Sequence, residues 1–319
     1  MIFPCHARLR FTSFLLSALL TGCVSIADNH SSEKVMTLYD TAIPPNGIAA
    51  PDEEALRDPK EPFPFLLNVS RPSLTIFLPV KPDAKLSAVI ICPGGAYRGL
   101  SINKEGYNVA RAFNKMGVAA IVLKYRVPSD RTMTDKTTGP LQDVQQAFRI
   151  VRNNASMWHI DPGRIGIVGF SAGGHLAATA SNQYAQPVLP DDNAPAVRPD
   201  FAVLVYPVIS MRDDITHRPS RSNLLGPDPS AAQIAHYSNE LATTAKTPPT
   251  FMVHAADDVT VSVANSFRYA EAMTQHGVPV ELLVFPHGGH GFGLHNATTQ
   301  DQWIDRCHDW LVSQGLLAK

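Results

Sequence analysis

The chain has 319 residues, of which 45% are hydrophobic and 17% are charged, and its formal net charge at pH 7 is −1. This composition is typical of a globular protein with a sizeable apolar core. A near-neutral balance without a basic patch argues against a nucleic-acid-binding protein.

The first residues have the pattern of an export signal. Arg8 and Arg10 precede an apolar run over residues 11–20, which is too short to span a bilayer. The run ends in Leu20-Thr-Gly-Cys23, which resembles the lipobox of bacterial lipoproteins: small residues at the cleavage site precede a cysteine whose thiol receives the lipid. We therefore predict a signal peptide over residues 1–22 and lipidation of Cys23. An ordinary secretory signal with a chance cysteine is the alternative.

Cleavage before Cys23 would yield an exported, lipid-anchored chain. It removes two of the 27 basic residues and none of the 28 acidic ones, so 25 basic residues face 28 acidic ones and the net charge becomes −3. Val24 follows the cysteine in place of the aspartate that often retains lipoproteins in the inner membrane, so we expect the outer membrane. Residues 23–63 would form the lipidated N-terminus, a tether and a segment that wraps over the domain.

Strands and helices alternate from residue 64 onward. Residues 86–92 and 118–125 have the apolar character of buried strands, and residues 104–115 and 139–155 have the periodicity of helices. The repeated strand–helix order predicts an α/β fold with a mostly parallel central sheet and helices on both faces. The site of such a fold lies at the carboxyl ends of the strands. We expect residues 64–319 to form one catalytic domain.

A glycine-rich loop, Pro93-Gly-Gly-Ala-Tyr97, follows the first of these strands. Glycines at this place let backbone N–H groups point at the negative charge of a tetrahedral intermediate. Gly94 and Gly95 are therefore predicted donors of an oxyanion hole. An ordinary turn between a strand and a helix is the alternative interpretation.

The most specific motif lies in residues 164–175, where an apolar run leads into Gly169-Phe-Ser-Ala-Gly173 and then into helix-forming residues. Strand, Gly-x-Ser-x-Gly and helix together form the pattern of a nucleophile elbow, which presents one serine at the tip of a strained turn. Glycines flank the turn because side chains there would collide with the adjoining strand or helix. Ser171 is the predicted nucleophile, and the N–H of Ala172 is the third predicted oxyanion donor.

Two further loops carry the partners that a serine nucleophile needs. The acidic pair Asp257 and Asp258 follows a predicted strand at residues 250–254, and Pro286-His-Gly-Gly-His-Gly-Phe-Gly293 follows another at residues 280–285. A histidine must take the proton of the serine hydroxyl, and a buried carboxylate must hold that imidazole in the right tautomer. Serine, then aspartate, then histidine is the chain order of α/β-hydrolases.

Together these motifs resemble the α/β-hydrolase family of bacterial carbohydrate esterases, which includes acetylxylan esterases and a feruloyl esterase-like group. A more distant likeness is to serine peptidases of the prolyl-oligopeptidase type. The resemblance covers roughly residues 70–315. It implies an α/β-hydrolase fold with Ser171 as nucleophile, Asp258 as acid and His290 as base. Ala96 stands where relatives often have a third glycine, and it still offers its N–H.

Several acidic residues compete for the role of the acid. Loops of this family place the acid three residues before a valine, which favours Asp258 ahead of Val261. Asp257 would then point elsewhere, as a cap of the following helix. Asp213 and Asp214, which follow an earlier strand, are less favoured candidates.

The histidines have different expected roles. His290 is favoured as the base over His287 because it lies inside Gly-Gly-His-Gly-Phe-Gly. His175 is expected to pack beneath the site, and His254 to be a core or hydrogen-bonded residue. No acidic or thiol partner with matching spacing supports a metal site at the two loop histidines, and no phosphate loop or dinucleotide fingerprint indicates a cofactor.

The expected function follows from the site and from the small cap. Residues 210–246 are polar and leave little room for an apolar lid, so long acyl chains should not be favoured. We therefore expect a serine esterase that removes acetyl groups from carbohydrate such as xylan or its oligosaccharides. A peptidase of the prolyl-oligopeptidase type is one alternative, although the chain has no room for a propeller. A non-catalytic binding lipoprotein is another, although every residue of the expected site is present. Cys92 and Cys307 are expected to be buried free thiols, and the oligomeric state is left open.

Overall fold

The computed structural model describes residues 1–2, 33–79, 85–189 and 195–317. Contacts divide the chain into residues Met1–His30 and a compact unit, Ser31–Lys319. The predicted lipidation site Cys23 and all but two residues of the predicted signal peptide lie outside the described residues. Within the described ranges, no helix is long and apolar enough to cross a bilayer.

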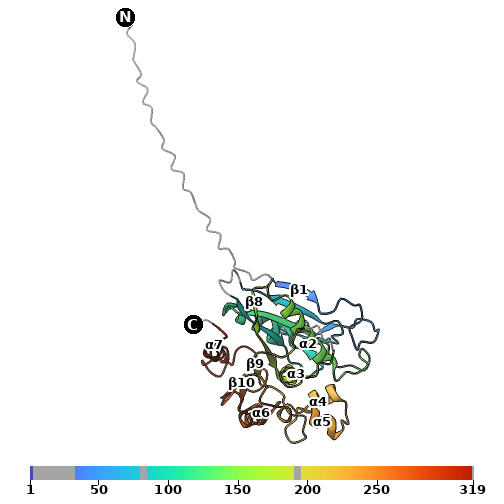
Figure 1. The fold of residues 1–319 in the computed structure, drawn as a ribbon. Coiled ribbons are helices and arrows are strands. Elements are labelled where there is room, and N and C mark those ends of the chain that lie inside the picture. Colours follow the sequence, from blue (N-terminus) through green and yellow to red (C-terminus); the bar gives the residue numbers. More distant parts are fainter. Residues whose placement is uncertain (3–32, 80–84, 190–194, 318–319) are drawn as a thin grey trace. The chain divides into compact units, whose positions relative to one another are not determined.

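An eight-stranded sheet forms the centre of the unit (Figure 1). Strand β4 runs antiparallel to both of its neighbours, β1 and β7, and the six strands from β7 to β11 in the sheet are parallel to one another, so the sheet is mostly parallel, as predicted. The order across the sheet is β1 (Glu33–Thr37), β4 (Ser73–Phe77), β7 (Ala119–Lys124), β5 (Leu86–Cys92), β8 (Ile160–Phe170), β9 (Ala202–Val205), β10 (Thr250–Ala255) and β11 (Val280–Phe285).

Helices connect the parallel strands. The helical elements are the π-helical turn η1 (Ile102–Tyr107), α1 (Asn108–Lys115), α2 (Gly139–Asn153), α3 (Ser171–Asn182), α4 (Arg218–Leu225), α5 (Ala231–His236), the 3-10 turn η2 (Asn239–Leu241), α6 (Ala264–Gln275) and α7 (Trp303–Ser313). Between β9 and β10 the chain forms only α4, α5 and η2, so the expected small cap is confirmed as short helices.

Helices cover both faces of the sheet, as two glycines of β8 show. Gly166 and Gly169 are three positions apart in the strand, an odd offset, so they face opposite sides of the sheet. A Cβ at Gly169 would lie 2.7 Å from Ala177 of α3, and one at Gly166 would lie 2.4 Å from the ring of Phe201. The Phe201 ring in turn packs edge-on against Trp310 of α7, with centroids 6.2 Å apart. Helices α3 and α7 therefore lie on opposite faces.

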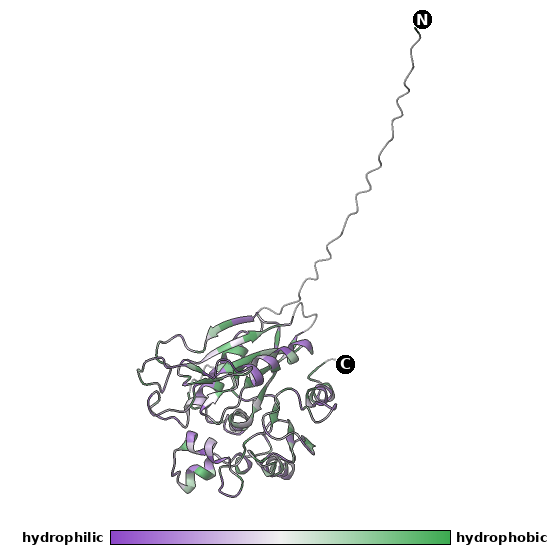
Figure 2. Ribbon diagram, turned by 180° about the vertical axis from the view of Figure 1, so that it is seen from behind, coloured by the Kyte–Doolittle hydropathy of each residue, from purple (hydrophilic) through white to green (hydrophobic). Residues whose placement is uncertain are grey.

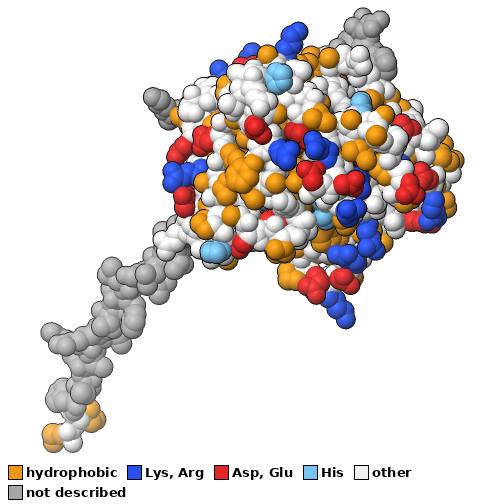
Figure 3. All heavy atoms as spheres, turned by 90° about the horizontal axis from the view of Figure 1, so that it is seen from below, with side chains coloured by type: hydrophobic (Ala, Val, Ile, Leu, Met, Phe, Trp, Pro, Cys, Tyr) orange, Lys and Arg blue, Asp and Glu red, His pale blue; other side chains and the backbone are white. Residues whose placement is uncertain are grey.

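The central strands supply the core. Every residue of β10, all but the first residue of β5 and residues 165–170 of β8 are buried, which is typical of a parallel sheet covered on both sides. Figure 2 shows this as a predominantly hydrophobic sheet beneath helices of mixed character. Cys92 and Cys307 are buried free thiols, as expected. On the face drawn in Figure 3, cationic and acidic side chains are interspersed, in line with the near-neutral net charge.

The fold begins earlier in the chain than residue 64, where we expected it. Strand β1 pairs with β4 inside the central sheet, and β2 (Ala55–Arg57) pairs with β3 (Phe65–Leu67) and through it with β6 (Gly99–Leu100) in a small second sheet. Between β1 and β2, Leu38 is buried and the Tyr39 hydroxyl donates to Asp143 (3.0 Å). The segment before residue 64 therefore belongs to the folded unit and does not merely cover it.

Candidate active site

Ser171 lies at a sharp turn where β8 runs directly into α3. Its φ angle is +51°, a left-handed conformation that a non-glycine residue rarely adopts. The flanking glycines are required by contact distances. A Cβ at Gly169 would lie 2.3 Å from the Gly173 carbonyl oxygen, and one at Gly173 would lie 2.1 Å from the Cys92 carbonyl oxygen. The close approach of β5, β8 and α3 thus explains the Gly-x-Ser-x-Gly sequence.

Three side chains from three loops form a continuous hydrogen-bond chain. The Ser171 hydroxyl donates to Nε2 of His290 (2.9 Å), and Nδ1–H of His290 donates to Oδ2 of Asp258 (2.6 Å). Ser171 follows β8, Asp258 follows β10 and His290 follows β11, so all three lie at the carboxyl edge of the sheet. In this geometry the imidazole of His290 can accept the hydroxyl proton of Ser171, and the Asp258 carboxylate fixes the imidazole tautomer.

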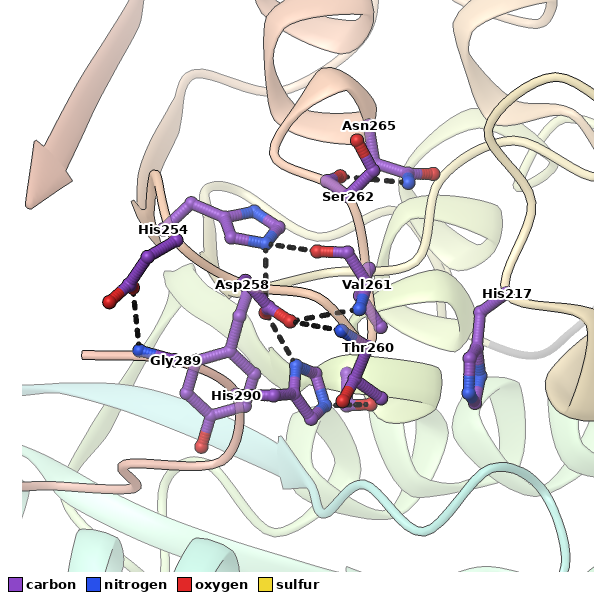
Figure 4. A network of polar contacts seen from close by, with 12 residues as sticks. His217, His254, Asp258, Thr260, Val261, Ser262, Asn265, Gly289 and His290 are labelled. Atoms are coloured by element: carbon purple, nitrogen blue, oxygen red, sulfur yellow. Dashed lines mark hydrogen bonds and ion pairs between the residues drawn. The ribbon is translucent and has the colours of Figure 1, made fainter. Parts of the chain in front are cut away.

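The Asp258 carboxylate is buried and accepts four hydrogen bonds. Oδ1 accepts from the backbone N–H groups of Thr260 and Val261 (2.9 Å each), and Oδ2 accepts from His290 and from Nε2–H of His254 (3.2 Å). Figure 4 shows the two imidazoles approaching the carboxylate from different sides. Burial by itself would raise the pKa of Asp258, but the hydrogen bonds from His254 and His290 outweigh it and hold the pKa well below its ordinary value.

Asp257 and His287, the alternative candidates for the acid and the base, form a second pair that is more exposed. Nδ1 of His287 lies 3.3 Å from Oδ2 of Asp257, whose Oδ1 accepts from the Gly289 N–H (2.8 Å). The prediction that Asp257 caps the following helix is wrong, because its carboxylate is held by the histidine loop. The other acids, Asp213 and Asp214, form surface ion pairs with arginines.

In the loop after β5, the prediction that Gly94 is an oxyanion donor is wrong. The Gly94 N–H donates to Oε2 of Glu105 (2.8 Å), so it does not point at a substrate. Gly95 has φ +142°, and a Cβ there would lie 2.0 Å from the Gly99 carbonyl oxygen, which explains the glycine. Ala172 occupies the first turn of α3, where no earlier turn supplies an acceptor. Gly95 and Ala172 remain as candidate donors.

Glu105 is a buried carboxylate that sequence reasoning missed. Besides Gly94, it accepts a hydrogen bond from the Tyr206 hydroxyl at Oε1 (2.8 Å), and that hydroxyl accepts from the Gly293 N–H (2.9 Å). The ring of Tyr206 packs against His290, with centroids 4.9 Å apart. Burial raises the pKa of Glu105, and the hydrogen bonds from Tyr206 and Gly94 partly offset this. Glu105 thus connects the loop after β5 (residues 93–97, the oxyanion loop of the prediction) through Tyr206 to the loop after β11 (residues 286–293, the histidine loop).

His175 is fully buried below the site, as expected, and contacts Tyr97 of the loop after β5. Nε2–H donates to the Tyr237 carbonyl oxygen and Nδ1 accepts from the Tyr97 hydroxyl, both at 2.8 Å, so the neutral tautomer is defined by its partners. Burial lowers the pKa of His175 to about 4. His254, in β10, is also fully buried, and its Nδ1 accepts from the Ser266 hydroxyl.

A cavity of about 830 Å³ opens beside Ser171 and His290. Its walls include Phe63 and Phe65, which come from the segment around β3, and His217, which precedes α4. Burial and the nearby His290 lower the pKa of His217. No cluster of three or more metal-ligating side chains occurs in the part of the chain that the structure describes.

The comparison with protein families decides where this chain belongs. Residues 74–273, well over half of the chain, match BD-FAE. The chain belongs to the BD-FAE family. This BD-FAE member is 38% identical over 260 residues to a protein named acetylxylan esterase from Xylanibacter ruminicola, and 34% identical over 227 residues to one named endo-1,4-beta-xylanase B from Butyrivibrio fibrisolvens. These matches cover 78% and 69% of the chain but only 50% and 35% of the relatives, so the chain spans half or less of their length.

Solved structures extend the comparison to the whole folded unit. An acetyl ester-xyloside bifunctional hydrolase from Caldicellulosiruptor lactoaceticus has a TM-score of 0.72 and 33% identity, and the match covers 92% of this chain and 100% of that one. A propionate-bound thermophilic esterase from Thermogutta terrifontis has a TM-score of 0.64 and 26% identity, with 80% and 95% covered. The BD-FAE member described here is therefore an ester-hydrolase domain with the α/β-hydrolase fold.

Proposed function

We propose that the protein is a serine esterase that removes short acyl groups, chiefly acetyl, from carbohydrate such as xylan or its oligosaccharides. The observation that carries this proposal is the hydrogen-bond chain from Ser171 through His290 to Asp258 at the edge of an open cavity. The names of the acetylxylan esterase and of the acetyl ester-xyloside hydrolase support the substrate class.

The proposed reaction passes through an acyl-enzyme. Ser171 Oγ attacks the acyl carbonyl carbon while His290 Nε2 takes the hydroxyl proton, and Asp258 stabilises the imidazolium that forms. The N–H groups of Gly95 and Ala172 bind the oxyanion. The tetrahedral intermediate expels the sugar hydroxyl, which receives the proton from His290. Water then attacks the acyl-enzyme with His290 again as base, which releases acetate and restores Ser171.

The short cap supports a preference for small acyl groups. Helices α4 and α5 are the only α-helices between β9 and β10, and α5 has no buried residue in the described unit. These short helices form no apolar lid over the site, so a long acyl chain would not be enclosed and would gain only part of the roughly 0.8 kcal/mol per methylene that full burial provides. An open mouth also admits a bulky sugar on the alcohol side.

A substrate panel tests the proposal directly. A chain lacking residues 1–23 would be assayed on acetylated xylan, p-nitrophenyl esters of two to eight carbons, a feruloyl ester and a prolyl amide. We expect the highest kcat/KM on acetyl esters, a steep fall beyond butyrate and no cleavage of the amide. Preference for octanoyl esters would contradict the acyl assignment, and preference for the prolyl amide would support a peptidase.

We further propose that the chain is exported and anchored through lipid on Cys23 to a bacterial outer membrane. The motif Leu20-Thr-Gly-Cys23 and the preceding short apolar run support this location. Replacing the thiol in Cys23→Ser should release the protein from the membrane fraction and leave esterase activity intact. Retention of Cys23→Ser in that fraction would indicate an uncleaved anchor.

A further inference from the structure

The cavity beside Ser171 is the middle one of three. A smaller cavity of about 180 Å³ shares Arg98 and Asn223 with it, and a third of about 750 Å³ shares Phe63 and Lys104 with it. Because each outer cavity shares lining side chains with the middle one, the three cavities adjoin one another in sequence, and we call them the cavity row. The row offers more volume than a single ester needs, which leaves room for sugar residues beside the esterified one.

The charge of the cavity row differs from that of the chain. The row is lined by six cationic side chains and two acidic ones, whereas the net charge of the whole chain is −1. The two acids are engaged, since Glu105 is buried in hydrogen bonds and Glu53 pairs with Arg131 (2.7 Å). The six cations are Arg57, Arg98, Lys104, Arg111, Lys115 and Arg131. Arg57, Arg111 and Arg131 each pair with an acidic side chain, so the excess rests on Arg98, Lys104 and Lys115. Clefts with an excess of cations concentrate anionic ligands.

Two of these cations each line two cavities: Arg98 lines the smaller and the middle one, and Lys104 lines the middle and the third one. Arg98 is exposed on a tight turn in which its own N–H and that of Gly99 both donate to the Gly95 carbonyl oxygen. The methylenes of Lys104 lie against Gly293, where a Cβ would be 3.1 Å from Cγ and Cε. Among the described residues neither cation has an acidic partner within 4.0 Å, in contrast to Arg57, Arg111 and Arg131.

Aromatic surface accompanies the charge. The Phe63 side chain is 44% exposed and forms part of the wall that the middle and third cavities share, and Phe65 lines the middle cavity. Aromatic faces of this kind give flat apolar area against which a sugar ring packs. The row therefore combines a flat apolar surface with fixed positive charge.

We propose that the cavity row binds an acylated oligosaccharide that carries carboxylate groups, that is, one with uronic acid residues near the esterified sugar. Arg98 and Lys104 pair with these carboxylates beside the scissile ester. The inference rests on the proposed esterase function, which supplies the ester and the sugar, and it adds the charge of the substrate. Guanidinium and ammonium groups without acidic partners are suited to bind carboxylates.

Matched substrates test this inference. Two acetylated xylo-oligosaccharides of equal length would be compared, one neutral and one with a uronic acid side residue. At low ionic strength we expect kcat/KM to be about tenfold higher for the anionic one, and the ratio to fall toward one at about 0.5 M salt, where charges are screened within a few ångströms. Arg98→Gln and Lys104→Gln should each lower the ratio by about three- to tenfold.

Arg268→Gln is the matched control, because Arg268 lies on α6 outside the cavities and pairs with Asp214 (3.5 Å). We expect it to leave the ratio unchanged. A ratio of one or less for the intact chain, or an equal loss in Arg268→Gln, would overturn the inference while neutral esters are still cleaved. Failure to cleave either ester would overturn the proposed esterase function as well.

Discussion

Two aspartate–histidine pairs connect the same two loops. They consist of the same residue types but differ in the distance between the side chains and in their burial. In the inner pair, Asp258 and His290 are 2.6 Å apart, with side chains 0% and 19% exposed. In the outer pair, Asp257 and His287 are 3.3 Å apart, with side chains 43% and 75% exposed. The two acids are adjacent in sequence and the two histidines are three residues apart.

The difference shows that burial and donor count, not residue type, decide what a pair does. The inner carboxylate accepts four hydrogen bonds away from water, so the imidazole beside it has one orientation and one tautomer. The outer pair stands in solvent, where water and salt screen the attraction. Only the inner histidine reaches the Ser171 hydroxyl.

The largest expected effect separates the two acids. Asp258→Asn places an amide among four donors and removes the acceptor that fixes the His290 tautomer, so kcat/KM on an acetyl ester should fall about 10³- to 10⁴-fold. Asp257→Asn should change it by less than about threefold, because the group is exposed and away from Ser171. Steady-state kinetics with circular dichroism as a folding control would measure both. Equal losses would erase the distinction between the pairs.

A third carboxylate sharpens the comparison, because Glu105 is buried like Asp258 but faces the oxyanion loop. Glu105→Gln replaces one of the two carboxylate oxygens, which accept from Gly94 and Tyr206, by a donor group. The loop that contains Gly94 and Gly95 should therefore shift, and kcat should fall about 100-fold while KM changes little. Tyr206→Phe, which leaves the Glu105–Gly94 bond in place, should have a smaller effect. Native kcat in a folded Glu105→Gln variant would show that this carboxylate has no positioning role.

The smallest effect concerns His175, a buried histidine without a carboxylate partner. Its pKa is lowered by burial from 6.5 to about 4. Between these values the unfolded chain binds a proton that the folded chain does not, so this group costs stability as the pH falls from 6.5 toward 4. The gap in unfolding free energy between wild type and His175→Gln should therefore shrink by about 2 kcal/mol from pH 7.5 to pH 5. Urea denaturation at the two pH values measures it, and a constant gap would refute the assignment.

Much of the fold could be predicted because its strands are continuous apolar runs between turn signals. The predicted ranges 86–92 and 280–285 are the bounds of β5 and β11. Strands β1, β2 and β3 escaped prediction, because each is short and its position is decided by pairing with distant strands. The π-helical turn η1 begins two residues before the helix that periodicity predicted over residues 104–115.

The residues of the candidate site could be predicted where a short sequence motif surrounds the residue itself. The Gly-x-Ser-x-Gly pattern indicates Ser171, the loop patterns of the family that the sequence resembles favour Asp258 and His290, and the structure brings the three together. The Gly94 donor was wrong because its partner, Glu105, lies eleven residues later in η1 and looks like any helical surface charge in the sequence. Phe63 was missed because the cavity wall is formed by a segment that we placed outside the catalytic domain.

The most direct test of the account is covalent labelling of Ser171. A fluorophosphonate probe should react with the intact chain once, and peptide mass spectrometry should find the adduct on Ser171, because His290 activates this hydroxyl alone. Ser171→Ala should take up no probe, should lose ester turnover by several orders of magnitude, and should unfold at nearly the same temperature as wild type. Labelling at another residue, or near-normal turnover in a folded Ser171→Ala variant, would contradict the account.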